Sequence, residues 1–388
     1  MRFFIVAICL FIFLSCKKEN KLSSNPDVLP APQNSELSAP IFETEYGNCY
    51  DFDDIQKNPL TILASNNLII SSIYYDGTTD KLLITKVNQT GGTIWQKNFT
   101  WSQKFKSGQC FETTSGDLIV IGASYSISNW VASKVYIAKL NALNGDTIWT
   151  RTYGHNYIDR GLVGYEDANS NYWIVDFNNQ DNKATLLKIG SNGDSLTSII
   201  DSPHATYKDA MITNNQEIII VGESSTMISS KRPVYITKYS NGVKGFSSDI
   251  ILNNYDDVQV SDVCQTLDGG FVVAGVCSNF ANTTFKYGFL LKTDAAGNKL
   301  WEKVLTQFNN SQISSCVEKQ QDVFYLGIGS YSSGKLYKYD LNNLTILDNI
   351  YRQPDAQLLI KNNTLYRGII ETNASFYETV KVKVHTIN

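Results

Sequence analysis

The stretch that decides the fold reads Leu291-Lys292-Thr293-Asp294-Ala295-Ala296-Gly297-Asn298-Lys299-Leu300-Trp301. Close copies run from Ile84 to Trp95 and from Ile137 to Trp149. Each copy carries a lysine in an apolar segment, then a turn glycine, then a tryptophan. Weaker copies extend the series of lysines, which are 45 to 54 residues apart: Lys86, Lys139, Lys188, Lys238, Lys292, Lys338 and Lys383. A period of about 50 residues made of strand-like segments predicts the blades of a β-propeller.

Each repeat divides into four expected strands. In the fifth repeat they are Val260–Thr266, Phe271–Cys277, Phe285–Thr293 and Lys299–Leu305. Glycine and asparagine occupy the turns between them, as tight hairpins require. The second of these strands is almost wholly apolar, which indicates burial on both faces. An irregular β-sandwich would not explain one phrase repeating in phase seven times, so we expect an all-β, seven-bladed propeller of four-stranded blades.

The last blade lacks its own fourth strand. Strands are expected near Ala356–Ile360, Leu365–Ile370 and Tyr377–His385, and then the given sequence stops. At the other end, Ile41–Gly47 copies the fourth-strand phrase Ile148–Gly154, with no first three strands before it. We therefore predict that the N-terminal strand closes the last blade and covers an edge that would otherwise be open. Residues 41–388 form the expected propeller domain.

The N-terminus carries an export signal. Met1 and Arg2 precede an apolar run, Phe3 to Leu14, which is shorter than the roughly 20 residues of a membrane-spanning helix. The ending Leu14-Ser15-Cys16 resembles a bacterial lipobox, although Phe13 stands where that motif prefers leucine. The resemblance implies a lipoprotein signal peptide at residues 1–15 and a lipid on Cys16. An uncleaved anchor or a plain secretory signal are the alternatives, and both also place the domain outside the cytoplasm.

Residues 16–40 are polar and contain Pro26, Pro30, Pro32 and Pro40. A segment of this composition buries too little apolar surface to offset its ordering entropy, so it is expected to be a flexible tether. Lys17 follows the lipid candidate, so the aspartate signal that retains some lipoproteins at the inner membrane is absent. The expected location is the cell envelope, at the outer membrane, on a side that the sequence leaves open.

Composition argues against several functions. The net charge of −4 and the isoelectric point near 5.5 give no reason to expect a nucleic-acid partner. His155, His204 and His385 lie far apart in no ligand-spaced motif, so no metal site is expected. No Gly-x-Ser-x-Gly elbow or phosphate loop is present. We expect no catalytic residue and no cofactor, and we expect a monomeric propeller.

Five cysteines follow Cys16: Cys49, Cys110, Cys264, Cys277 and Cys316. Export permits disulfides, but the odd number and the absence of tight spacing favour buried thiols. A bridge between neighbouring blades, such as Cys264 with Cys316, remains an alternative.

Two phrases of the fifth repeat, Thr266–Gly275 and Leu291–Trp301, resemble a known family. They are similar to blades of bacterial secreted propellers of the quinoprotein-like (PQQ-like) repeat superfamily. The resemblance covers residues 41–388 and implies fold far better than activity. A quinone-dependent enzyme would need acidic, basic and stacking groups around the cofactor together with calcium, and the sequence does not present that set.

The recurring lysines are interpreted as structural, because a residue repeated in every blade serves the blade. Binding is instead expected on the loops that join second to third strands and one blade to the next. Aromatic side chains beside Asn, Ser and Asp suit a peptide or a sugar ring there, although each could instead cover a blade edge. The candidates are Tyr74, Tyr125, Trp130, His155, Tyr157, Arg160, Tyr255, Phe280, Phe285 and Tyr331.

The sequence therefore predicts a membrane-anchored lipoprotein propeller that acts as a binding or scaffold module for a protein partner. A glycan-binding surface lipoprotein is the alternative. A hydrolase or a quinone-dependent oxidoreductase is a third hypothesis, which would require clustered carboxylates or a bound cofactor.

Overall fold

The structure is a computed structural model. It describes residues 36–49, 58–78, 80–99, 104–126, 129–154, 159–178, 182–201, 205–330, 333–341, 343–350, 355–372 and 378–387. Residues 35–388 form one compact unit. The expected signal peptide, Cys16 and most of the expected tether lie outside the described residues. Within the described ranges, no helix is long and apolar enough to span a membrane.

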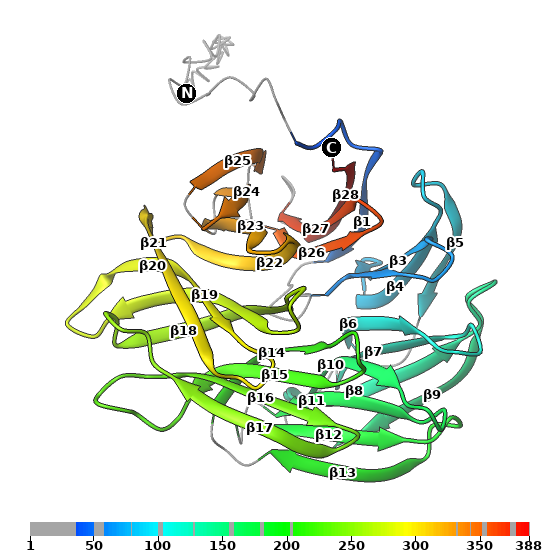
Figure 1. Ribbon diagram of the computed structural model, residues 1–388. Helices are drawn as coiled ribbons and strands as arrows, with labels where there is room; N and C mark the ends of the chain where they lie inside the picture. Colours follow the sequence, from blue (N-terminus) through cyan, green and yellow to red (C-terminus); the bar gives the residue numbers. More distant parts are fainter. Residues whose placement is uncertain are drawn as a thin grey trace, which may run out of the picture. The chain divides into compact units, whose positions relative to one another are not determined.

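Strand follows strand along the described chain, and Figure 1 shows them grouped in sheets around one axis. The first two blades contain β2 (Leu60–Ile62), β3 (Leu68–Tyr75), β4 (Asp80–Val87), β5 (Thr93–Phe99), β6 (Lys104–Glu112), β7 (Leu118–Ser126), β8 (Asn129–Leu140) and β9 (Thr147–Tyr153). The third and fourth contain β10 (Asp159–Glu166), β11 (Tyr172–Asn178), β12 (Lys183–Ile189), β13 (Ser195–Asp201), β14 (Ala205–Ile212), β15 (Ile218–Ser224), β16 (Val234–Ser240) and β17 (Val243–Ile250).

The remaining blades follow the same plan. The fifth and sixth contain β18 (Asp257–Gln265), β19 (Phe271–Asn279), β20 (Asn282–Thr293), β21 (Lys299–Asn309), β22 (Gln312–Gln320), β23 (Val323–Ser330), β24 (Ser333–Asp340) and β25 (Asn343–Ile350). The last contains β26 (Asp355–Lys361), β27 (Thr364–Thr372), β28 (Glu378–Thr386) and β1 (Phe42–Cys49). The expected seven-bladed propeller of four-stranded blades is confirmed.

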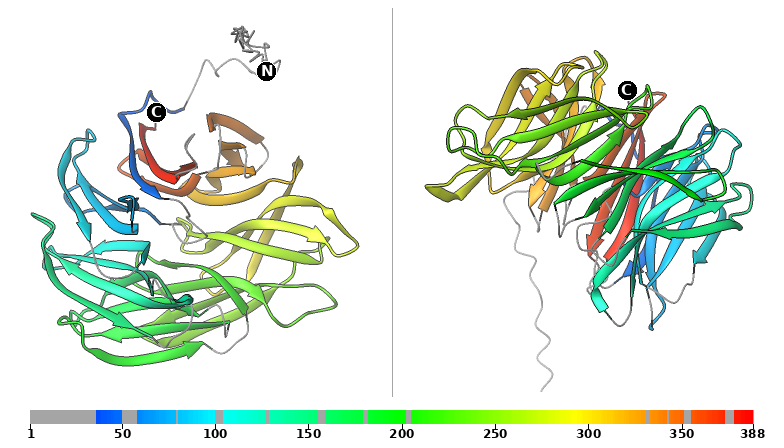
Figure 2. Two further views of the ribbon diagram at one scale, coloured as in Figure 1. Left: turned by 180° about the vertical axis from the view of Figure 1, so that it is seen from behind. Right: turned by 90° about the horizontal axis from the view of Figure 1, so that it is seen from below.

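The first strands of the blades lie nearest the axis, since they contact one another from blade to blade, as β14 contacts β18 and β18 contacts β22. Second strands are buried on both faces: every residue of β15 is buried, as are all but the last of β19. The apolar runs of the sequence therefore correspond to the middle of each blade. Figure 2 shows the sheets from behind and edge-on.

The N-terminal strand closes the ring. Strand β1 pairs antiparallel with β28, with Phe42 opposite Val384 and Tyr46 opposite Val380. Asn48 adds one parallel bridge to Tyr74 of the first blade. The two strands lie side by side near the C-terminus in Figure 1. Closure of the last blade by the N-terminal strand is thus confirmed.

The repeated glycine and tryptophan meet across blade boundaries. Gly145, in the β8–β9 turn, lies against the indole of Trp95 in the preceding blade: a Cβ there would come within 2.8 Å of the ring. Trp95 Nε1 also donates a 3.0 Å hydrogen bond to the carbonyl of Ala142 in the same turn. We call such a turn, in which a glycine leaves room for an aromatic side chain of the preceding blade, a glycine socket. It explains why glycine and tryptophan recur together in the sequence.

The same glycine socket recurs around the ring. In the other blades where it is found, the glycine and its aromatic or apolar partner are Gly193 with Trp149, Gly242 with Trp173 and Ile199, Gly297 with Phe246, and Gly91 with Phe42. The last of these involves β1. The closing strand therefore packs the side chain of Phe42 against the first blade, as inner blades pack their aromatic side chains against the blade that follows.

The recurring lysines make contacts within and between blades. In four blades the ammonium pairs with an acid in the turn between first and second strands, at 2.6–3.2 Å: Lys139 with Asp117, Lys188 with Asp167, Lys238 with Glu217, and Lys292 with Asp268. Lys188 also lies over the indole ring of Trp173, 5.0 Å from its centroid. These contacts are those of structural residues.

The sixth blade obtains its acid from elsewhere in the chain. Glu36 accepts hydrogen bonds from Lys338 (2.6 Å), from Tyr325 (2.8 Å) and from Lys319. The next residue, Leu37, is 4% exposed and forms a bridge with Ile387. The chain is therefore fixed to the propeller from Glu36, five residues before the expected start of the domain at residue 41.

Candidate functional site

The propeller has two faces that differ in their connections. One, the turn face, carries the tight turns between first and second strands, such as Thr113–Asp117 and Thr266–Gly270. The other, the loop face, carries the connections between second and third strands and between blades. The sequence placed its candidate binding residues on the loop face.

A repeated clamp joins neighbouring blades at the turn face. A residue at or near the end of a first strand reaches to the preceding blade and accepts a hydrogen bond from a turn N–H. Glu112 holds Ala64 N at 2.6 Å, and Gln265 holds Asn214 N at 2.9 Å. Two further pairs are Glu166 with Thr114 N, and Glu318 with Leu267 N. These side chains bind backbone N–H groups, so each clamp depends on the position of the turn residue and not on its side chain.

In the fourth blade the clamp position is occupied by Ile212. The strand register shows the equivalence, because Ile212 pairs with the first residue of β15 as Glu166 pairs with that of β11. An isoleucine cannot accept a hydrogen bond, so no side-chain clamp forms at this junction of the third and fourth blades. A pocket lies at this point of the ring.

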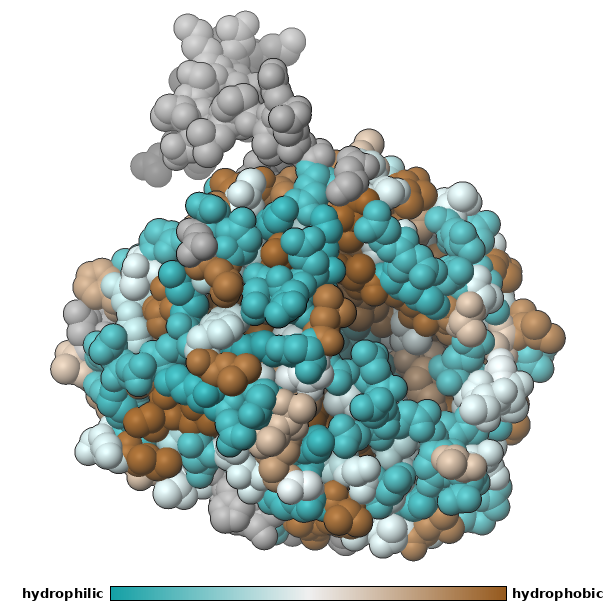
Figure 3. Space-filling model, in the orientation of Figure 1, coloured by the Kyte–Doolittle hydropathy of each residue, from teal (hydrophilic) through white to brown (hydrophobic). Residues whose placement is uncertain are grey.

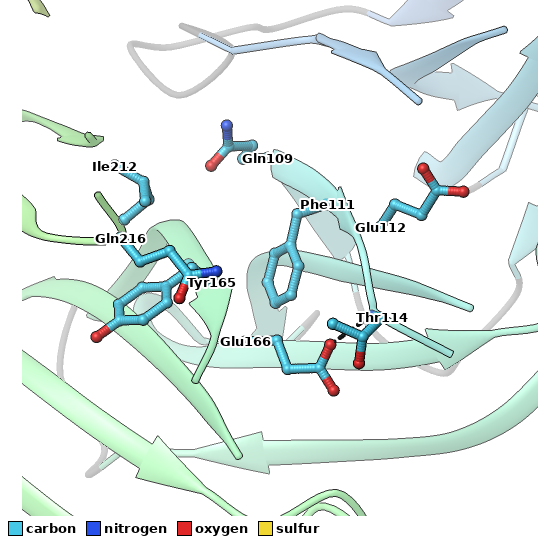
Figure 4. A pocket seen from close by; sticks show the side chains of 9 residues that line it. Gln109, Phe111, Glu112, Thr114, Tyr165, Glu166, Ile212 and Gln216 are labelled. Atoms are coloured by element: carbon cyan, nitrogen blue, oxygen red, sulfur yellow. Dashed lines mark hydrogen bonds between the residues drawn. The ribbon is translucent and has the colours of Figure 1, made fainter. Parts of the chain in front are cut away.

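The pocket has a volume of about 280 Å³. It is formed by three blades, through β6 and its turn in the second blade, β10 in the third, and β14 and its turn in the fourth. The lining residues are Gln109, Phe111, Glu112, Thr114, Gly164, Tyr165, Glu166, Ile212 and Gln216. Figure 4 shows the Phe111 ring among these side chains, with the Glu166–Thr114 hydrogen bond beside it.

The chemistry of the pocket is that of hydrogen-bond acceptors on an aromatic wall. Glu112 and Glu166 each use Oε2 in a clamp. Gln109 Oε1 is buried and receives no hydrogen bond from the described residues. Burial raises the pKa of Tyr165 to about 12, so its hydroxyl stays protonated at neutral pH. No lysine or arginine is among the described lining residues.

The predicted loop-face residues fall into three groups. Phe280 and Phe285 are 45% and 42% exposed on the β19–β20 hairpin, and Tyr74 is 37% exposed at the end of β3. Tyr255 packs edge-to-face on Tyr287 at 6.1 Å and contributes to the core of the fifth blade. The side chains of Tyr125, Trp130 and Arg160, and the whole of His155, Tyr157 and Tyr331, lie outside the described residues.

The exposed residues do not form one continuous patch in the described structure. Phe280 and Phe285 share a hairpin of the fifth blade, whereas Tyr74 lies in the first blade. Figure 3 shows hydrophobic and hydrophilic residues interspersed over the visible face. The structure therefore brings two of the predicted residues together and leaves Tyr74 separate.

A second polar cluster lies between the third and fourth blades. The Asp201 carboxylate is 3% exposed and accepts hydrogen bonds from the hydroxyls of Tyr207 (3.0 Å), Tyr235 (2.9 Å) and Tyr239 (2.7 Å) and from Lys244 (2.7 Å). Burial alone would raise the pKa of Asp201, but the donors outweigh it and hold the pKa below its usual value. Because the acceptor is enclosed by its own donors, this cluster is structural.

The sequence reasoning missed the pocket. Its signal was the polar clamp residue of the second, third, fifth and sixth blades, which is replaced by Ile212 in the fourth blade, as it is by Ile62 in the first. That signal becomes visible only when the repeats are aligned by strand register.

No protein-family model and no curated protein matches this sequence. Solved structures resemble it in fold at low identity. A polysaccharide lyase, Uly1, has a TM-score of 0.56 at 8% identity over 89% of this chain and 93% of that chain. The protein YCF48, solved bound to D1 peptide, has a TM-score of 0.54 at 8% identity over 95% and 100%. A chain of the mitotic checkpoint complex has a TM-score of 0.53 at 10% identity over 92% and 96%.

Proposed function

We propose that this chain is a scaffold propeller that binds a protein partner by taking one basic side chain of that partner into the turn-face pocket. The observation that carries the proposal is the buried, unbonded acceptor Gln109 Oε1 in a pocket that two glutamates also line and whose described lining contains no lysine or arginine. A buried acceptor left without a donor costs free energy, which a ligand donor would recover.

The size of the pocket favours a side chain over a small molecule. Pockets that enclose drug-sized ligands measure about 300–1,000 Å³ and bury most of the ligand. At about 280 Å³, and formed between blades at the surface, this pocket holds one large side chain. Binding strength would then come from the surrounding surface, with the pocket as its anchor.

The charge and the aromatic wall favour arginine or lysine as the occupant. The ammonium or guanidinium group would donate to Gln109 and to the free edge of Glu166, which are the kinds of acceptor that charged donors bind best. The face of Phe111 adds a cation–π contribution of about 0.5–2 kcal/mol. A carboxylate or phosphate in the same place would face Glu112 and Glu166.

The fold is compatible with this function. Propellers of similar fold include a protein bound to a peptide and a chain of a multiprotein complex, and they also include a polysaccharide lyase. The expected lipid on Cys16 and the tether before Glu36 would hold such a scaffold at the cell envelope, at the outer membrane. Incorporation of labelled fatty acid into the wild type, and its loss in Cys16→Ala, tests the anchor separately.

The partner is tested by crosslinking the tagged full-length protein in its native membrane, followed by pull-down and mass spectrometry. We expect a partner in stoichiometric amount, reduced at least tenfold in Thr114→Trp, because the indole would fill the pocket mouth. The matched control is Asn214→Trp, which changes the equivalent exposed turn residue of the fourth blade, outside the pocket lining. Equal losses in both variants would contradict the assignment of the pocket.

The occupant is tested with the purified protein and two small probes. N-acetyl-arginine amide is expected to bind in the millimolar range and its neutral citrulline analogue at least tenfold more weakly. Binding of both probes alike would contradict the charge argument. If recovery of the partner depends on Phe280 and Phe285 but not on Thr114, the binding site lies on the loop face instead. Recovery of a polysaccharide in place of a protein would support glycan binding.

A further inference from the structure

Two cysteine thiols meet across a blade boundary. Cys264 lies on β18 of the fifth blade and Cys316 on β22 of the sixth, and their Sγ atoms are 3.3 Å apart. The side chains are 8% and 3% exposed and belong to one apolar core. We propose that Cys264 and Cys316 are a cross-linking site, which an external disulfide oxidises to an inter-blade bond while the protein folds.

The backbone around the pair is already held in place. The Cys316 N–H donates a 2.6 Å hydrogen bond to Asp262, two residues before Cys264. Since β18 and β22 are neighbouring first strands near the axis, this bond fixes how they face one another. A disulfide needs an Sγ–Sγ distance of about 2 Å, which side-chain rotation and a small approach of the strands would supply.

Cys110 does not share this arrangement. Strand register places Cys110 of the second blade at the position of Cys316 in the sixth. In the blade that precedes it, the position of Cys264 is occupied by Thr61. Cys110 therefore has the same surroundings without the partner thiol, and it serves as an internal control.

The reaction balances with an external disulfide such as oxidised glutathione. One cysteine thiolate attacks that disulfide, forms a mixed disulfide and releases one glutathione thiolate. The second cysteine thiolate then attacks the mixed disulfide and releases the other. The two cysteines lose two protons and two electrons in all, and the oxidant is reduced to two thiols.

Burial limits the reaction to folding. The hydrogen bond to Cys264, together with burial, holds the pKa of Cys316 well above its usual value. Because the thiolate is the nucleophile, the folded ring reacts slowly. Exchange is expected while the blade boundary is still open to solvent.

The experiment refolds the full chain from denaturant with reduced and oxidised glutathione, alkylates free thiols under denaturing conditions and maps the peptides by mass spectrometry. We expect a linked Cys264–Cys316 peptide in most molecules, with Cys110 and Cys277 alkylated. The linked protein should melt about 5 °C or more above the reduced one, because the bond closes a long loop. Full alkylation of both Cys264 and Cys316 would overturn the proposal.

Two variants sharpen the result. Cys264→Ser should abolish the linked peptide and the rise in melting temperature, whereas Cys110→Ser should leave both unchanged. Links shared evenly between Cys110 and the pair would overturn the proposal. If Cys264→Ser does not fold, peptide mapping of the wild type alone decides between the two outcomes. Oxidation of the folded protein at the rate seen during refolding would overturn the folding-stage step.

Discussion

The closing blade and the fifth blade have the same four-stranded architecture but different connections. In the fifth blade, short turns join β18 to β19 and β20 to β21, so each strand stays close to its neighbour in the chain. In the closing blade, β1 pairs with β28 from the opposite end of the domain, with Phe42 opposite Val384. The entropy cost of loop closure is therefore small for the fifth blade, whereas the pairing of β1 with β28 depends on the rest of the ring.

The difference shows where cooperativity enters the fold. Strand β1 makes contacts of the same kind as an inner fourth strand: a ladder on one side, and Phe42 in the glycine socket at Gly91. It also makes ion pairs, since Glu43 contacts Lys381 at 2.8 Å and Lys383 at 3.5 Å. The ladder and the ion pairs join the two ends of the domain within the last blade, and Phe42 joins that blade to the first. Losing β1 therefore opens the whole ring, whereas losing β21 would strip one blade.

The largest expected effect comes from removing the closing strand. Deletion of Ile41–Gly47 should lower the melting temperature by more than 10 °C or prevent folding, because it exposes the edge of β28 and empties the socket at Gly91. Thermal unfolding followed by circular dichroism measures the change. A truncated protein that melts at the wild-type temperature would contradict this.

A circular permutant is the control for that deletion. Moving residues 36–49 behind Asn388 through a short linker turns β28 and β1 into a local hairpin, as in the fifth blade. The permutant should fold and melt at or above the wild-type temperature, because the contacts are kept and the loop entropy is reduced.

The next largest effect compares matched tyrosines of the two kinds of blade. Tyr46 of β1 is 5% exposed in the core of the closing blade, whereas Tyr153, its counterpart in β9, is half-buried. Tyr46→Ala should reduce the free energy of unfolding by about 3 kcal/mol and Tyr153→Ala by about 1 kcal/mol. Denaturant titration measures both, and the reverse order would contradict the importance assigned to β1.

Acid should weaken the closing blade before the fifth. His385 of β28 is 5% exposed, and its Nδ1 lies 3.0 Å from the Ser38 carbonyl. Burial lowers the pKa of His385, an effect that nearby Arg367 and Lys383 reinforce while Asp348 and the Ser38 carbonyl oppose it.

The sign of that effect follows from the lowered pKa. The unfolded state binds the proton more readily, so stability should fall as the pH drops below about 6.5, by at most about 1.4 kcal/mol per pH unit. It should level off below the folded pKa. Melting temperatures of the wild type and His385→Gln between pH 8 and pH 5 test this, and equal pH dependence in both would contradict it.

The smallest effect concerns the ion pairs of β1. Glu43 is about one-third exposed, and burial, which alone would raise its pKa, is outweighed by Lys381 and Lys383. Glu43→Gln should reduce the free energy of unfolding by less than about 1 kcal/mol, and the difference from wild type should shrink as salt is added. A loss that is independent of salt would indicate a packing role instead.

Repetition made the fold predictable. Lysine, glycine and tryptophan recur because each meets a partner that also recurs, such as Trp95 with the turn at Gly145. A contact used in most blades leaves a periodic trace in the sequence. The closing strand was predictable for the same reason, because Phe42 stands in the position of Trp149 and fills the same kind of socket.

Contacts used once leave no such trace. The segment around Glu36 is polar and proline-rich, and its attachment depends on Lys319 and Lys338, 283 and 302 residues away. Ile212 looks like any apolar strand residue until its position is compared with Glu166 and Gln265. The sequence could not show that Phe280 is exposed whereas Tyr255 packs on Tyr287, because Phe280 and Tyr255 are both aromatic residues near strand ends.

The glycine sockets also give a direction to the five blades that contain them. Each of these blades receives the ring of the preceding blade, so a fragment cut between two of them has an unplaced ring at one end and an empty socket at the other. Complementary surfaces on opposite ends of one molecule join head to tail and extend into filaments unless they meet in a closed ring. Phe42 fills the socket at Gly91 from within the same chain, so these two complementary surfaces meet in a closed ring.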